Sequence, residues 1–107
     1  DLAETLFVYR AVSSSRYDQT EIRTGDFFAV AGDRILQCGP DLVEVVGEAL
    51  SQFDLDQRGN ITLFQGDPAE SEQMERLLES LGSRFPALEL DRFHGGQKRE
   101  LVIVSIE

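Results

Sequence analysis

NITLFQGDPAESEQMERLLESLGSRFPALELDRF, residues 60–93, contains the elements that decide the fold: a strand, a helix and a second strand. Residues 60–64 form a short run rich in β-branched and aromatic side chains, which is typical of a strand. Residues 88–93 alternate apolar and charged side chains, as a half-exposed strand does. Two strands joined through a helix in this way pair in parallel by a right-handed crossover. We therefore expect a parallel strand pair within a sheet.

The helix between these strands has clear start and stop signals. Asp67-Pro68-Ala69-Glu70 offers a capping carboxylate, a proline at the first helical position and a glutamate in the first turn. Pro86 is expected to end the helix, because proline cannot continue the backbone hydrogen-bond ladder. The apolar residues recur at helical spacing and form one stripe: Met74, Leu77, Leu78, Leu81 and Phe85.

A second amphipathic helix is predicted upstream, in residues 42–53. Asp41 precedes it and Glu44 follows three residues later, which is the spacing of a capping box. Gly47 lowers the helix propensity by about 1 kcal/mol relative to alanine, which is compatible with close packing there. The apolar stripe of this helix comprises Leu42, Val45, Val46, Ala49, Leu50 and Phe53.

Four further strands are predicted. Residues 5–12 are rich in β-branched and aromatic side chains, and residues 101–106 are the most apolar run, which we expect at the centre of the sheet. Residues 27–30 and 34–37 flank Ala31-Gly32-Asp33 and indicate a β-hairpin, because glycine supplies the positive φ of a tight turn. The polar residues 13–19 are expected to form a loop, and residues 21–24 a connector.

The predicted order is β-β-β-α-β-α-β-β, which indicates an α/β (α+β) fold. Two helices with one apolar stripe each favour a two-layer sandwich, with both helices on one face of a mixed sheet. A chain of 107 residues corresponds to one domain, residues 1–107. The helix-facing layer is expected to include Leu42, Val46, Leu50, Met74, Leu78 and Leu81. The opposite face remains for a partner, and Phe7 and Phe28 are the candidates for it.

The composition restricts the classes of partner. With 20 acidic and 10 basic residues the net charge is −10, which argues against nucleic acid and anionic membrane surfaces. The acidity serves either solubility or the docking of a basic partner. One cysteine, Cys38, excludes an intramolecular disulfide, and no apolar run approaches a membrane span; a cytoplasmic location is expected. The chain does not begin with methionine, which suggests a fragment of a longer polypeptide.

Recognisable catalytic and metal-binding motifs are missing from the sequence. Gln65-Gly66-Asp67-Pro68 lies between a strand and a helix, yet it lacks the further glycines and the lysine of a phosphate-binding loop. His94 is the only histidine, and no serine or cysteine lies in a nucleophile motif. One histidine and one cysteine do not make a zinc site. We expect neither a catalytic group nor a metal in this domain.

One candidate site follows from the parallel strand pair. Residues 65–67 and 94–97 should emerge at the same edge of the sheet, the carboxyl edge where α/β proteins usually bind ligands. The candidate residues are Gln65, Asp67, His94, Gly95, Gly96 and Gln97. Two interpretations stay open. Both segments are turns that use glycine for backbone freedom, or the His94 imidazole and the Gly95-Gly96 N–H groups hold a carboxylate.

These motifs, in this order, resemble a known family. The C-terminal end of the dihydroxyacetone-kinase-like subunit of bacterial fatty acid kinase (FakA or YloV type) shows a strand ending in Gly-Asp, a Glu-rich helix, an aromatic-Gly-Gly-Gln turn and a terminal apolar strand. The corresponding segments here are 62–67, 70–81, 94–97 and 101–107, with 21–26 and 32–35 matching upstream. His94 replaces the aromatic residue of the turn, and residues 13–18 depart from the family's acidic loop.

The resemblance implies a non-catalytic C-terminal domain within a larger kinase. ATP and magnesium would bind in another domain of the parent protein, and this domain would dock a fatty-acid carrier of the DegV type. The domain also resembles the C-terminal part of DegV-type proteins. Two alternatives remain: a small-ligand domain that binds a fatty acyl group or another anion, and a homodimerisation domain.

Overall fold

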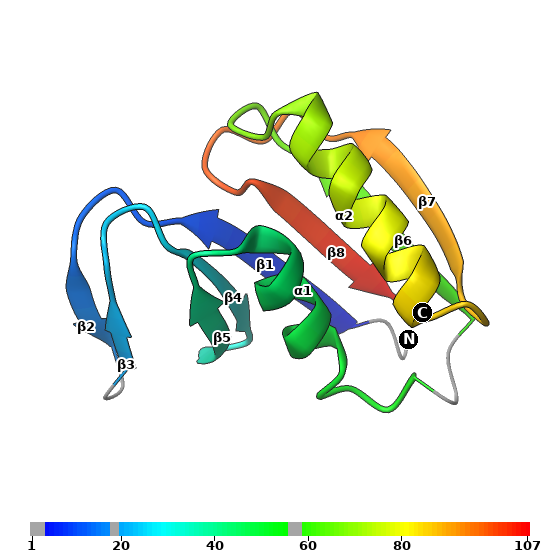
Figure 1. Ribbon diagram of the computed structural model, residues 1–107, viewed down its shortest axis with the longest axis horizontal. Helices are drawn as coiled ribbons and strands as arrows, with labels where there is room; N and C mark the ends of the chain where they lie inside the picture. The colour runs from blue at the N-terminus through cyan, green and yellow to red at the C-terminus, as the bar shows by residue number, and fades with distance from the viewer. Residues whose placement is uncertain (1–3, 18–19, 56–58) are drawn as a thin grey trace.

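The computed structural model describes residues 4–17, 20–55 and 59–107, and its main sheet has the predicted order of elements (Figure 1). The strands of this sheet are β1 (Glu4–Arg10), β4 (Phe27–Ala31), β5 (Arg34–Gly39), β6 (Asn60–Gln65), β7 (Glu89–His94) and β8 (Val102–Ile106). The helices are α1 (Leu42–Leu50) and α2 (Ser71–Arg84). The predicted α+β class is therefore confirmed.

The spatial order of the six-stranded sheet is β5-β4-β1-β8-β6-β7. Strands β6 and β7 pair in parallel across α2, as predicted, while β8 pairs antiparallel with both β1 and β6. The most apolar run of the chain thus occupies the centre of the sheet, also as predicted. Strands β4 and β5 form the predicted hairpin, with Gly32 at φ 63° in its turn.

Both helices lie on the same side of this sheet and cover one of its faces (Figure 1). Alternate residues of each strand point into the layer between sheet and helices; in β8 these are Val102, Val104 and Ile106. Five of the six residues predicted for the helix side of this layer are buried, and Leu78 packs against it half-buried. We call the opposite side of the sheet, which neither helix covers, the open face.

Two strands lie where the sequence predicted a loop and a connector. β2 (Ser15–Tyr17) and β3 (Thr20–Ile22) pair as a two-stranded antiparallel ribbon that projects from one end of the main sheet (Figure 1). The polar sequence gives no local signal for this ribbon. The ribbon is held by the hydrogen bonds between its two strands and by the buried side chain of Ile22. The loop predicted over residues 13–19 was therefore wrong for residues 15–17, and residues 18–19 lie outside the described residues.

The start of α2 also differs from the prediction. The helix begins at Ser71 with Glu70 as its N-cap residue, and the Glu70 N–H donates to Gln73 Oε1 at 3.1 Å. Asp67 does not cap it, because Asp67 lies three residues before the N-cap residue; its carboxylate pairs with Lys98. In contrast, Asp41 caps α1 as predicted, accepting from the Val43 N–H at 3.0 Å. α2 ends at Arg84, two residues before Pro86.

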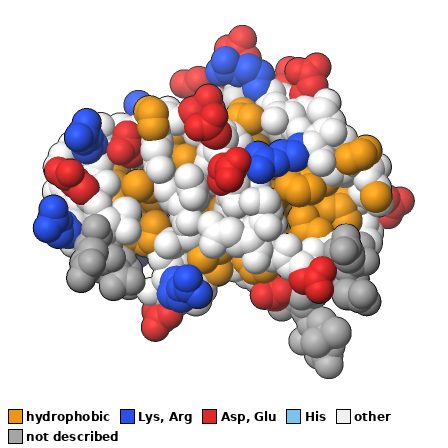
Figure 2. Space-filling view, turned by 60° about the horizontal axis from the view of Figure 1, so that its bottom comes forward, with side chains coloured by type: hydrophobic (Ala, Val, Ile, Leu, Met, Phe, Trp, Pro, Cys, Tyr) orange, Lys and Arg blue, Asp and Glu red, His pale blue; other side chains and the backbone are white. Residues whose placement is uncertain are grey.

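Side chains of both charges are spread over the surface and border areas of hydrophobic surface (Figure 2). Within the described residues, no helix is both long and apolar enough to cross a membrane.

Candidate functional site

The two loops predicted to share one edge of the sheet do meet there. The Gly95 and Gly96 N–H groups donate to the Gln65 carbonyl oxygen at 2.8 and 3.2 Å. The Gln97 side chain donates from Nε2 to the Phe64 carbonyl oxygen at 2.7 Å, and the Asp67 N–H donates to the Gln97 carbonyl oxygen at 2.8 Å. The loops after β6 and β7 are therefore bonded to each other at the carboxyl edge.

These bonds bear on how the edge could hold a carboxylate. The N–H pair of Gly95 and Gly96 was the expected anion donor, yet both groups already serve the Gln65 carbonyl. In this structure both N–H groups are engaged within the chain, and the binding of a carboxylate at this edge stays a prediction. A methyl group at Gly95 would collide with the Gln97 side chain and approach Phe64 Cβ within 3.1 Å. Gly95 thus leaves room for the Gln97 side chain, and Gly96 supplies a positive φ of 74°, both of which fit the turn interpretation.

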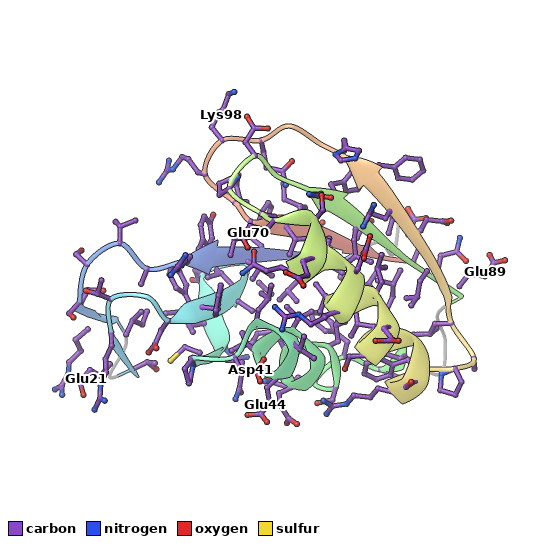
Figure 3. The ribbon with its side chains drawn as sticks, turned by 45° about the horizontal axis from the view of Figure 1, so that its top comes forward. Glu21, Asp41, Glu44, Glu70, Glu89 and Lys98 are labelled. Atoms are coloured by element: carbon purple, nitrogen blue, oxygen red, sulfur yellow. The ribbon has the colours of Figure 1, made fainter. Side chains whose placement is uncertain are left out.

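The remaining candidate residues are arranged separately. Asp67 Oδ2 and Lys98 Nζ form an exposed ion pair at 2.6 Å, and this carboxylate raises the pKa of Lys98. Figure 3 shows Lys98 on the loop before β8, at the end of the molecule where α2 begins near Glu70. The side chain of His94 is exposed at the end of β7. Gln65 is buried, and its Oε1 has no hydrogen-bond partner within the part of the chain that the structure describes.

The open face carries a feature that the sequence did not reveal. One residue from each of the six strands lies in the same cross-strand register, and all six are apolar. We call this line the apolar row; from β5 to β7 it consists of Ile35, Val30, Phe7, Ile103, Phe64 and Phe93. At the usual strand spacing of about 4.8 Å, the row is about 24 Å long.

Neighbouring residues set the limits of the row. On one side the next register line is polar: Thr5, Ser105, Thr62 and Asp91. On the other side Tyr9 and Phe28 stack, with ring centroids 5.2 Å apart. The side chain of Phe93 is 55% exposed. Phe7 and Phe28 therefore lie on the open face as predicted, whereas Phe64, Phe93 and Ile103 were missed.

The sequence predicts only that side chains alternate between the two faces of each strand. It does not predict which residue of a neighbouring strand lies opposite. In β6, Thr62 and Phe64 lie on the same face, so the aromatic side chain of Phe64 was the one local sign that this face is partly apolar. Among the described residues, no three His, Cys, Asp or Glu side chains gather closely enough to hold a metal ion.

Comparison with known proteins agrees with this architecture. A family model that describes the C-terminal domain of FakA-like fatty acid kinase subunits matches residues 3–107. An uncharacterised protein of Staphylococcus haemolyticus is 28% identical over 98 residues, which are 91% of this chain and 18% of that protein. A Staphylococcus aureus protein, also uncharacterised, is 25% identical over 97 residues, again 91% of this chain and 18% of that protein.

The chain thus spans less than a fifth of the length of these relatives. The family model, in contrast, covers the chain almost from end to end. This chain belongs to the FakA-like C-terminal family, the C-terminal domains of fatty acid kinase subunits.

Proposed function

We propose that this chain is a non-catalytic partner-binding domain at the C-terminus of a fatty acid kinase subunit. In this proposal it docks a fatty-acid carrier of the DegV type, and a separate domain of the parent protein binds ATP and magnesium and phosphorylates the acyl carboxylate. The parent protein acts in the cytoplasm. Family membership supports the connection to a fatty acid kinase.

The apolar row is the observation that carries the docking proposal. Six apolar side chains span the whole width of the open face, and the Phe93 side chain at one end is 55% exposed. Contiguous apolar surface of this kind marks interaction sites in soluble proteins. Aromatic residues are also the side chains that most often supply the binding energy at interface centres. The open face is therefore the proposed docking surface.

The carboxyl edge has a supporting part in this proposal. Its hydrogen bonds between the loops after β6 and β7 hold Phe64 and Phe93 at neighbouring ends of their strands. Preorganised aromatic side chains lose little conformational entropy on binding. The six predicted site residues would then position the docking surface and would not bind the ligand themselves.

Calorimetry of this chain with the cognate carrier tests the proposal. We expect a saturable heat of binding at micromolar concentration, and the full-length kinase protein is the positive control. Absence of binding by the chain, where the full-length protein binds, overturns it. Light scattering of the chain alone provides a second test, because a dimer that buries Phe93 would assign the open face to a second copy.

A further inference from the structure

The main sheet has two edges, and the fold covers them unequally. At the β5 edge, Gln52 Nε2 donates to the Leu36 carbonyl oxygen at 2.8 Å. The β2–β3 ribbon also reaches this edge, where Cys38 Sγ donates to the Glu21 carbonyl oxygen at 3.7 Å. At the other edge, β7 is the outermost strand and lies beyond α2 (Figure 1). Among the described residues, no strand or helix runs along the outer side of β7.

Alternate residues of β7 direct their backbone groups away from β6. The N–H groups of Glu89 and Gly95 donate to carbonyl oxygens beside the two ends of β6, at 2.9 and 2.8 Å. In a parallel pair every second residue faces the neighbouring strand, so Leu90 and Arg92 face outward. Within residues 4–17, 20–55 and 59–107, the backbone N–H and C=O groups of these two residues have no hydrogen-bond partner. We call this outer side of β7 the free edge.

The free edge is regular enough to receive a further strand. β7 pairs with β6 over its whole length without a register shift, whereas the β4–β5 pair shifts between Ala29 and Val30. β7 also contains no proline; the last one in the chain is Pro86. Proteins often protect an exposed edge with a bulge, a proline or charged side chains, and of these β7 has only the charges.

Those charges disfavour pairing with a second copy. Antiparallel pairing of two β7 strands about a two-fold axis places Asp91 opposite Asp91, or Arg92 opposite Arg92, in the two registers with the longest overlap. Like charges directly opposite each other destabilise a strand pair. The net charge of −10 on each copy adds to the repulsion. The free edge therefore suits a chain of different sequence.

The side chains of β7 define which sequence fits. β7 directs Glu89, Asp91 and Phe93 to the open face, and Leu90 and Arg92 to the side of the helices. Figure 3 shows Glu89 at this margin of the molecule. Within the described residues Asp91 and Arg92 form no ion pair, and the Phe93 side chain is 55% exposed. These three side chains are therefore open to a neighbouring strand.

An antiparallel strand places its side chains directly opposite those of β7. Opposite charges and apolar pairs in these positions each stabilise the pairing. Read from the residue opposite Phe93 to the one opposite Glu89, the matching pattern is apolar, acidic, basic, apolar, basic.

We propose that the free edge binds an extended segment of a partner protein with this pattern, which becomes a seventh strand of the sheet. Main-chain hydrogen bonds to Leu90 and Arg92 hold the segment, and the side chains select it. The apolar residue opposite Phe93 lengthens the apolar row by one strand. The inference does not rest on carrier docking, because the bonds come from the edge of the sheet and not from its open face. Either proposal can fail without the other.

Titration of the ¹⁵N-labelled chain with the end-blocked peptide Thr-Ile-Glu-Lys-Val-Lys-Thr, followed by NMR, tests the inference. We expect saturable shifts of the amide signals of Leu90 and Arg92, and slower hydrogen exchange at both. The same peptide, N-methylated at its glutamate and valine, keeps every side chain but lacks the two N–H groups that donate to β7. It is expected to bind at least about tenfold more weakly. Equal affinity of the two peptides, or no saturable shift with the first, overturns the proposal.

A third peptide tests the side-chain pattern. Thr-Ile-Lys-Glu-Val-Glu-Thr exchanges the charges and places like charges opposite Asp91, Arg92 and Glu89. It is expected to bind at least about threefold more weakly than the first peptide. Equal or tighter binding overturns the assigned pattern.

Arg92→Pro tests the edge itself. Proline at an outward-facing position removes an unpaired N–H and leaves the bonds to β6 in place, so the chain should stay folded while peptide binding is lost. Arg92→Ala, which keeps the N–H, is the matched control and should bind within about fivefold of the wild type. Equal binding by the two variants excludes strand addition.

Two other occupants of the free edge would also overturn the proposal. Concentration-dependent shifts of the Leu90 and Arg92 amide signals without peptide would assign the edge to a second copy. Slow hydrogen exchange of both amides in the full-length protein without peptide would assign it to a segment of the parent protein.

Discussion

Phe64 of β6 and Phe93 of β7 lie opposite each other on parallel strands, with their ring centroids 6.0 Å apart and their planes at 26°. The pair ends the apolar row on the side of β7. The Phe93 side chain is 55% exposed, while that of Phe64 is half-buried. A substitution at Phe93 should therefore affect partner binding more than the free energy of unfolding.

Phe93→Ser is expected to weaken carrier binding at least about tenfold and to lower the free energy of unfolding by only about 1–2 kcal/mol, because about half of its side chain is already exposed in the folded state. Calorimetry and urea unfolding measure the two effects. Asp91→Ser, on the same strand and face but outside the row, is the matched control and should retain affinity. Unchanged affinity in Phe93→Ser would remove this end of the row from the docking surface.

Phe7→Ser and Phe28→Ser are also expected to weaken carrier binding. The sequence alone suggests that these changes leave the melting temperature nearly unaltered. Both side chains are half-buried, with Phe7 between Val30 and Ile103 in register and Phe28 against Tyr9, so a loss of about 1–3 kcal/mol is expected instead. Urea unfolding of both variants checks this. A loss above about 4 kcal/mol would identify the residue as core.

Gly66→Ala is expected to destabilise the domain by about 3 kcal/mol, because the new methyl group would meet the backbone carbonyl oxygen of Glu100. The backbone on both sides must move, and with it the loop that leads into β8. Gly59→Ala is the control: a methyl group there meets nothing within 4 Å, so the change should stay within about 1 kcal/mol. Equal effects of the two substitutions in urea unfolding would contradict the close approach.

Gln65→Met is expected to raise the free energy of unfolding by about 1 kcal/mol, because the buried Oε1 that it removes has no partner in the described part of the chain. Gln73→Met is the comparison, and it is expected to lower the free energy of unfolding. Its Oε1 accepts from the Glu70 N–H at the start of α2, and losing this cap should cost about 1 kcal/mol. A destabilised Gln65→Met variant would indicate that Oε1 is solvated or bonded in solution.

Tyr9 is expected to make stability depend on alkaline pH. Burial, and then the Glu100 carboxylate, raise the pKa of Tyr9 above its usual value of 10.0. A folded-state pKa above the unfolded one adds stability that is complete below about pH 10 and is lost as the pH rises through the folded pKa. In a Tyr17→Phe background, ultraviolet absorbance reports Tyr9 alone. Glu100→Gln should lower its pKa, while Glu44→Gln on α1 should not.

The sequence by itself determined the elements whose signals are local. The stripe from Met74 to Leu81, the cap at Asp41 and the turn at Gly32 each depend on residues close together in the chain, and the structure confirms all three. The same holds for the parallel pair of β6 and β7, since a strand–helix–strand unit has few ways to close. Local propensity and hydrophobic periodicity are sufficient for these features.

Tertiary structure alone decided the β2–β3 ribbon, the bonding of the carboxyl edge and the apolar row. The Asp67 carboxylate, predicted to cap α2, instead pairs with Lys98, 31 residues away in the chain. The Gly95 and Gly96 N–H groups were expected to donate to an anion, but in the structure they donate to the Gln65 carbonyl oxygen. The apolar row needs the register of six strands. Such pairings are long-range, and no periodicity along the sequence encodes them, because register is set by packing across the sheet.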